Sequence, residues 1–209
     1  MRGIAGLFFL LSMPLPAGCG SKGEVAFASG AFEAVEILVS AEAGGRIMAL
    51  AVEEGEVLVA GQEVGHLDCR PLRPDNVDLQ LKRCRITAPS AGTVLVKYAQ
   101  AGEITSPGKP LFKMADTSVM TLRAYVTSDQ LSAVKLGDAV PVTADFDAGG
   151  TRSYQGKIVW ISTKSEFTPK TIQTRDERAN LVYAMKVAVP NDGYLKIGMY
   201  GTIAAPSHE

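Results

Sequence analysis

The chain has 209 residues, of which 46% are hydrophobic and 7% aromatic, and its 21 basic residues nearly balance its 22 acidic ones. This composition is ordinary for a folded protein with one or two modest cores, so it argues against a disordered chain. A net charge of -1 offers no electrostatic footprint for nucleic acid, and that class of function is excluded.

Residues 1–18 have the layout of a secretory signal peptide. Arg2 supplies a positive charge, the segment IAGLFFLLSM is apolar, and small residues in PLPAGC lead to Cys19. The apolar segment is too short to span a bilayer, which takes about 20 residues. We therefore expect the mature protein to leave the cytoplasm for the periplasm or cell envelope.

The same segment resembles the signal of bacterial lipoproteins, in which cleavage leaves the cysteine as a diacylated first residue. The resemblance implies lipidation of Cys19 and a lipid anchor at the inner membrane. Pro16 departs from the pattern, because leucine is usual three places before the cysteine. Gly20 is not the aspartate that often marks inner-membrane retention, so outer-membrane sorting stays an alternative, as does a plain secretory signal.

Residues 19–34 are small, polar and glycine-rich, and this composition predicts a tether. After the tether, the same pattern of residues occurs twice, with an offset of 47 places between the two copies. Each half alternates apolar and polar residues, as strands with one buried face do, and each is too small to bury a core alone. Residues 35–68 and 85–116 are therefore predicted to close one flattened barrel. The coinciding pairs are Gly45 and Gly92, Gly55 and Gly102, Gly61 and Gly108, Ile47 and Val94, Val57 and Ile104, Val64 and Leu111, and Leu67 and Met114, the apolar ones being predicted to face the core.

Two cysteines, Cys69 and Cys84, lie at the ends of the segment that joins the halves. In an oxidising compartment an even pair favours a disulfide, which would stabilise the fold by about 3 kcal/mol. The alternatives are two reduced thiols, or a zinc site built from His66 and both cysteines. The zinc site lacks an evident fourth ligand, and the spacing matches no zinc finger.

Residues 117–205 are predicted to form a separate small β-barrel, followed by a tail at 206–209. Alternation predicts strands over 119–126, 139–146, 154–162 and 181–189, and a final hairpin over 193–204. A short helix is expected after Thr127, because Thr127 and Gln130 form a capping box and Gly137 supplies a stop. The long polar stretch from 162 to 180 is either a functional loop or a flexible strand connector.

The order of these segments resembles the HlyD-type membrane fusion proteins, the periplasmic adaptor subunits of efflux and secretion systems. The paired halves, the segments ITAPSAGTV and GEITSPGKPLFKMAD, and the stretch FTPKTIQTRDERANLVYAMKVAVPNDGYLKIGMYGTI carry the resemblance. It implies a mainly β fold, in which a split lipoyl/biotinyl-like flattened barrel precedes a small β-barrel domain with one short helix. It also implies an ABC-type permease as inner-membrane partner, self-association into a ring, and no cofactor.

The connector, residues 69–84, departs from the family pattern. Typical members insert a long helical hairpin between the two lipoyl halves, and its tip meets an outer-membrane channel. Here Pro71 and Pro74 prevent helix in the first part, and the rest allows two turns at most, with Val77 and Leu81 on one side. Contact with an outer-membrane channel is therefore not expected.

Catalysis is not predicted, because the chain has only His66 and His208 to serve a histidine-based site. A biotin or lipoyl carrier would need a modifiable lysine at a tip, and Lys82 lacks the neighbours typical of carriers. A free-standing envelope lipoprotein with a binding or scaffolding role is the nearer alternative. Five methionines are interpreted as core residues, with copper ligation in a metal exporter as the alternative. They are Met48, Met114, Met120, Met185 and Met199.

Overall fold

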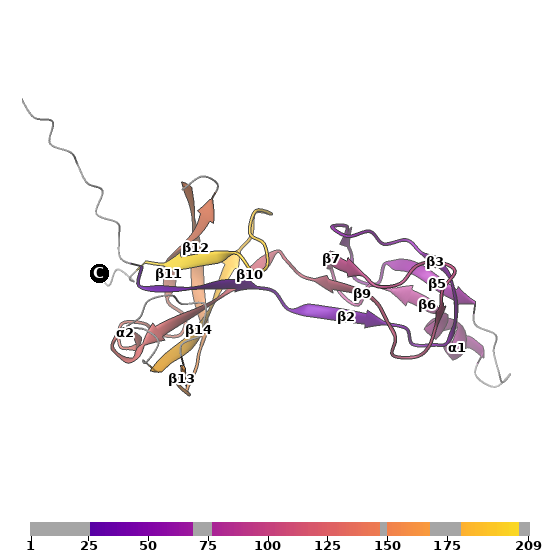
Figure 1. Cartoon of the computed structure of the whole chain (residues 1–209), viewed down its shortest axis with the longest axis horizontal. Coiled ribbons are helices and arrows are strands. Elements are labelled where there is room, and N and C mark those ends of the chain that lie inside the picture. Colours follow the sequence, from indigo (N-terminus) through magenta and orange to yellow (C-terminus); the bar gives the residue numbers. More distant parts are fainter. Residues whose placement is uncertain (1–25, 69–76, 147–149, 168–180, 205–209) are drawn as a thin grey trace, which may run out of the picture.

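The computed structural model describes residues 26–68, 77–146, 150–167 and 181–204. Two β units lie end to end along the long axis of the molecule (Figure 1). We call the described part of residues 36–115 the repeat unit. The barrel unit consists of residues 26–33 together with the described part of residues 119–204.

The repeat unit consists of two four-stranded sheets, with the strand orders β2-β9-β7-β4 and β6-β5-β3-β8. The offset of 47 places converts each strand of one half into a strand of the other. First-half strands are β2 (Glu36–Ser40), β3 (Gly45–Leu50), β4 (Val57–Leu58) and β5 (Glu63–Asp68). Their counterparts are β6 (Arg85–Thr87), β7 (Gly92–Lys97), β8 (Ile104–Thr105) and β9 (Pro110–Ala115).

The two halves are interlocked, because β4 pairs with β7 of the second half and β8 pairs with β3 of the first. Equivalent hydrogen bonds support the two pairings between the halves, β4 with β7 and β8 with β3. The amide of Gly55 donates to the carbonyl of Val94 at 2.8 Å, and the amide of Gly102 donates to the carbonyl of Ile47 at 2.7 Å. Both glycines have a positive φ, at 89° and 94°, which other residues rarely adopt. The predicted repeat is therefore confirmed as a structural one.

Burial confirms three of the four predicted apolar pairs and corrects the fourth. Val57 and Ile104 are 72% and 69% exposed, whereas the residues that follow them, Leu58 and Thr105, are 0% and 5% exposed. Each lies in a two-residue strand, so alternation gives no run long enough to identify the inward face. The confirmed pairs are Ile47 and Val94, Val64 and Leu111, and Leu67 and Met114.

The described part of the connector forms one helix, α1 (Val77–Cys84), with eight residues. At 1.5 Å per residue it extends about 12 Å, which agrees with the predicted two turns. Cys84 is buried at its end, next to β6. Pro71 and Pro74 lie outside the described residues.

The barrel unit closes because β10 pairs with β14, which completes a ring with the order β10-β1-β15-β11-β12-β14. The strands are β1 (Ala28–Glu33), β10 (Val119–Thr127), β11 (Ala139–Phe146), β12 (Gly150–Ile161), β14 (Leu181–Pro190) and β15 (Tyr200–Ile203). A short strand, β13 (Glu166–Phe167), flanks β14. Thus the four predicted strands of this region are confirmed, with shifted ends.

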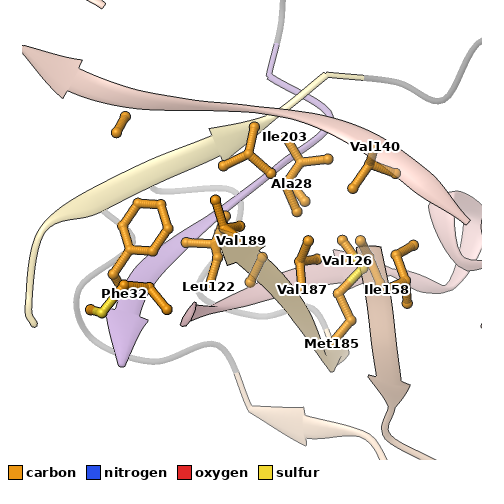
Figure 2. Close-up of a cluster of buried hydrophobic side chains, with 14 of the residues drawn as sticks. Ala28, Phe32, Leu122, Val126, Val140, Ile158, Met185, Val187, Val189 and Ile203 are labelled. Carbon is orange, nitrogen blue, oxygen red and sulfur yellow. The ribbon is translucent and has the colours of Figure 1, made fainter. Parts of the chain in front are cut away.

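Alternate residues of these strands fill the inside of the barrel. Phe32, Leu122, Val187 and Ile203 are fully buried and come from four different strands (Figure 2). The helix α2 (Ser128–Leu131) covers one end, and its capping box of Thr127 and Gln130 is present as predicted. The helix is only four residues long, so it ends well before Gly137.

Two predictions are wrong for described residues, namely the tether over residues 28–33 and the final hairpin, and residues 19–25 lie outside the described residues. The tether over residues 19–34 includes β1, because Ala28 and Phe32 alternate inward and Gly30 leaves room for the backbone of Arg123. The final hairpin does not form. Instead, β15 pairs with β1 and β11, which are remote in sequence.

The finding that Leu58, and not Val57, faces the core gives a stability prediction. Leu58→Ala should lower the free energy of unfolding by about 2–5 kcal/mol, because it leaves a cavity in the core. Its neighbour provides the matched control, since Val57→Ala should change stability by less than about 0.5 kcal/mol. Urea unfolding of both variants measures these changes. Similar losses in the free energy of unfolding for the two variants would contradict the assignment of Leu58 to the core.

Thr105 gives a second prediction, because its buried hydroxyl has no hydrogen-bond partner within the described structure. Thr105→Val should raise the free energy of unfolding by about 1 kcal/mol, since it removes an unpaired polar group at nearly constant shape. Thr93→Val is the control and should lower it, because the hydroxyl of Thr93 lies 3.1 Å from that of Thr117. A destabilised Thr105→Val variant would show that the hydroxyl is paired in solution.

Candidate interaction site between the two units

Two chain segments connect the units, residues 34–35 and residues 116–118. In the second, the carboxylate of Asp116 accepts hydrogen bonds from the amide of Ser118 at 2.9 Å and from its hydroxyl at 2.6 Å. These two bonds hold the pKa of Asp116 below its ordinary value, and the bond from the hydroxyl of Ser118 makes the larger contribution. The carboxylate therefore stabilises the turn by which the chain enters β10.

Asn191 ties this linker to the loop that follows β14. Its side-chain amide donates to the carbonyl of Thr117 at 2.9 Å and to that of Leu195 at 3.0 Å. Its side-chain oxygen accepts from the amides of Gly193 and Leu195, and its own amide donates to the carbonyl of Ser118. One side chain thus holds the linker and the 191–197 loop in a single arrangement.

A groove of about 700 Å³ lies between the units. Val57 and Leu95 line it from the repeat unit, and Leu195 and Ile197 line it from the barrel unit. Val57 is 72% exposed and Ile197 is 39% exposed, so apolar side chains on both walls face solvent. Thr93, Asp116, Thr117, Ser118, Asn191 and Lys196 supply the polar part of the lining.

A cluster on the barrel unit holds the 191–197 loop on its other side. Arg152 forms an ion pair with Asp192 at 2.8 Å, and its guanidinium lies over the rings of Tyr154 and Tyr194, at 6.0 and 5.5 Å. The hydroxyl of Tyr154 donates to Asp192 at 3.2 Å. A hydrogen bond from the amide of Tyr194, together with Arg152, lowers the pKa of Asp192, whereas partial burial raises the pKa of Tyr154.

The chemistry of this groove is that of a contact surface. Its carboxylate and amide groups are already engaged in hydrogen bonds to the backbone, and its walls are apolar. Within the described residues there is no group of three or more His, Cys, Asp or Glu side chains that could hold a metal ion. The described helices include none that is both long and apolar enough to cross a membrane.

Of the candidate site residues that the sequence indicated, those that the structure describes do not line this groove. Cys19 and Cys69 lie outside the described residues, so lipidation of the first and the disulfide of the second with Cys84 stay predictions. His66 and Lys82 are exposed, on β5 and α1. Among the methionines, Met114, Met120 and Met185 are fully buried, which confirms the core interpretation for them. Met48 is 53% exposed and Met199 is half-buried.

Sequence reasoning missed Asn191, Asp192 and Arg152. The available signal was the Asn-Asp-Gly run at 191–193, because Asn and Asp side chains often bond to the backbone of the turn that follows them. Arg152 carried no such signal, since its partner lies 40 places away in the sequence.

The chain shares partial sequence similarity with proteins named as UPF0194 membrane proteins, although no protein-family model matches it. A UPF0194 membrane protein of Yersinia pseudotuberculosis serotype O:3 is 36% identical over 129 residues, which are 61% of this chain and 39% of that protein. A UPF0194 membrane protein of Acidithiobacillus ferridurans is 34% identical over 141 residues, 65% of this chain and 41% of the other. The chain thus spans about two fifths of the length of these curated relatives.

Solved structures share the arrangement of both units. A MacA-MexA chimeric protein, which contains the MexA alpha-hairpin domain of Pseudomonas aeruginosa, matches with a TM-score of 0.62 and 18% identity over 87% of this chain and 83% of its own. The membrane fusion protein Spr0693 of Streptococcus pneumoniae R6 matches at 0.59 and 16%, over 87% and 98%. The periplasmic adaptor protein EmrA matches at 0.52 and 9%, over 86% and 97%.

The chain has the membrane fusion, or periplasmic adaptor, fold. The resemblance to HlyD-type adaptors is confirmed at this level. In this adaptor fold the groove lies where the repeat unit meets the barrel unit, and the described part of the connector contributes the two-turn α1. Two of these solved structures are named as a membrane fusion protein and a periplasmic adaptor protein.

The Asp192 cluster gives a prediction about pH. Because the pKa of Asp192 is below its ordinary value of 3.8 in the folded protein, its carboxylate stabilises the fold at neutral pH. This stabilisation is lost as the pH falls through the lowered pKa. Arg152→Gln should raise the pKa of Asp192, but not to 3.8, since the hydrogen bond from the amide of Tyr194 remains.

Carboxyl chemical shifts measured by NMR between neutral and acidic pH test this prediction. Asp116 is the internal control, because Ser118 and not Arg152 lowers its pKa. An unchanged Asp192 titration in Arg152→Gln, or an equal shift at Asp116, would contradict the assignment of the ion pair.

Proposed function

We propose that the chain is the periplasmic adaptor subunit of an export complex whose inner-membrane pump is an ABC-type exporter. The observation that carries this proposal is the joint match of both units, in one arrangement, to solved adaptor and membrane fusion proteins over most of the chain. An adaptor works by contact, and the exposed apolar walls between the units suit contact rather than catalysis.

In this proposal Cys19 carries the lipid that holds the protein at the inner membrane. The barrel unit faces the permease, and copies of the chain pack side by side in a ring. Conformational changes of the pump pass through these lateral contacts and alter the exit path. Contact with an outer-membrane channel is not part of the proposal, because a helix of about 12 Å does not reach across a periplasm.

A free-standing envelope lipoprotein is the second candidate, and the short α1 favours it. A carrier of biotin or lipoate has less support. Lys82 lies on the helix α1, whereas a carrier presents its lysine on a tight turn between strands.

Photo-crosslinking in intact cells distinguishes the first two. A photoreactive amino acid replaces either Leu136 of the barrel unit or Ile104 of the repeat unit, which are 68% and 69% exposed. The adaptor proposal expects an inner-membrane permease to crosslink from position 136, with much less from position 104. Mass spectrometry of the tagged, purified chain identifies the partner.

Self-contacts alone from both positions, with no permease, would instead favour the free-standing lipoprotein. Equal recovery of a permease from the two positions would contradict the orientation of the barrel unit toward the pump. A Cys19→Ser variant, expressed in parallel, tests the anchor through its release into the soluble periplasmic fraction.

A further inference from the structure

A row of five residues crosses the outside of the barrel unit on five neighbouring strands. Tyr200 on β15 pairs with Ala31 on β1, and Ala31 pairs with Arg123 on β10. Arg123 pairs with Lys186 on β14, which pairs with Trp160 on β12. Directly paired residues point to the same face of a sheet, so these five side chains form one continuous row.

The row faces solvent. Tyr200 is 57% exposed and Trp160 is 41% exposed, at the two ends of the row. Next to the two cations along their strands, Leu122 and Val187 are fully buried in the barrel core (Figure 2), whereas Val159 next to Trp160 is 48% exposed. The row therefore places two half-buried cations between two exposed aromatic side chains, with the small Ala31 next to Arg123.

The two cations are held in place but are not neutralised equally. Arg123 donates to the hydroxyl of Tyr125 at 3.2 Å and pairs with Glu166 at 3.4 Å. Its pKa is raised, chiefly by the hydrogen bond to Tyr125, so the guanidinium stays charged. Lys186 lies over the ring of Trp160 at 5.5 Å and has no ion pair within the described part of the chain.

This arrangement leaves a repulsion that a bound anion would relieve. Like charges directly opposite each other on neighbouring strands destabilise a sheet, and Arg123 and Lys186 occupy such positions. Glu166, through an ion pair, and Glu33, through a weaker electrostatic attraction, both act on Arg123. Neither forms an ion pair with Lys186 within the described residues, so Lys186 is the cation that a partner's carboxylate would pair with. Trp, Tyr and Arg are the side chains that most often dominate binding at protein interfaces.

We propose that this row binds an acidic segment of a partner protein, with a carboxylate at Lys186 and apolar contacts on Trp160 and Tyr200. A lipid surface fits less well, because the flanking row carries Thr121 and Ala188 in place of the wide apolar face that membrane association uses. The inference goes beyond the proposed function and does not depend on which protein the barrel unit meets in cells.

The chain offers its own reporter, because Trp160 is its single tryptophan. The full chain is titrated with a capped hexaglutamate peptide, and with hexaglutamine as the neutral probe, while the emission of Trp160 is recorded. We expect a saturable change with hexaglutamate only. Raising the salt from about 50 to about 300 mM should weaken it severalfold, since exposed charges are screened.

Lys186→Gln should lower the apparent affinity for hexaglutamate by at least about fivefold. Lys157→Gln is the matched control, because Lys157 is exposed on the same strand as Trp160 but pairs with Ala188 in the next row. It removes the same charge and should change the affinity by less than about twofold. Calorimetry repeats both titrations, so that a changed emission of the variant itself does not affect the result.

Three results would overturn the proposal. The first is no saturable response to hexaglutamate, and the second is equal weakening by Lys186→Gln and Lys157→Gln, which would indicate diffuse electrostatics. The third is a response of Trp160 to vesicles of phosphatidylcholine and phosphatidylglycerol without one to the peptide, which would make the row a lipid contact. None of these results bears on the crosslinking test of the adaptor function.

Discussion

The exchange of β4 and β8 between the two halves of the repeat unit is the constraint on which the rest of the structure depends. Each sheet holds two strands of each half, because β2 and β4 join β9 and β7, and β6 and β8 join β5 and β3. The equivalent bonds from Gly55 to Val94 and from Gly102 to Ile47 support the pairings of β4 and β8. Because neither sheet is complete alone, the two halves are expected to fold together. The chain therefore leaves this unit at equivalent points, toward the barrel unit after Ala115 and toward α1 after Asp68.

The position of the groove follows from this symmetry and from one asparagine. The repeat ends beside the linker at 116–118, where Asn191 binds the carbonyl of Thr117 and orders the 191–197 loop. Arg152 and Asp192 hold that loop from the barrel side. Because these contacts join the linker, the 191–197 loop and the barrel unit, they constrain how one unit can move relative to the other.

Local patterns in the sequence predicted much of the fold but little of the candidate site. The capping box at Thr127 and the two-turn limit of α1 depend on residues close in the chain, and the 47-place repeat is recognised because one local pattern occurs twice. The structure confirms all three. The predicted tether was wrong over residues 28–33 because Gly30 and its small neighbours resemble a linker in composition. Only the approach of β10 and β15 turns that segment into a strand.

By itself, the sequence determined most of the strands, the glycine turns of the repeat unit and the joining of its two halves, because glycine positions and alternation are local patterns that occur twice in the chain. Only the tertiary structure decided that Leu58 and not Val57 faces the core, and that β15 joins β1 and β11. It also brought Arg123, Lys186 and Trp160 into one row. Each of these outcomes is a contact between residues distant in the chain, and such contacts depend on the register in which the barrel closes.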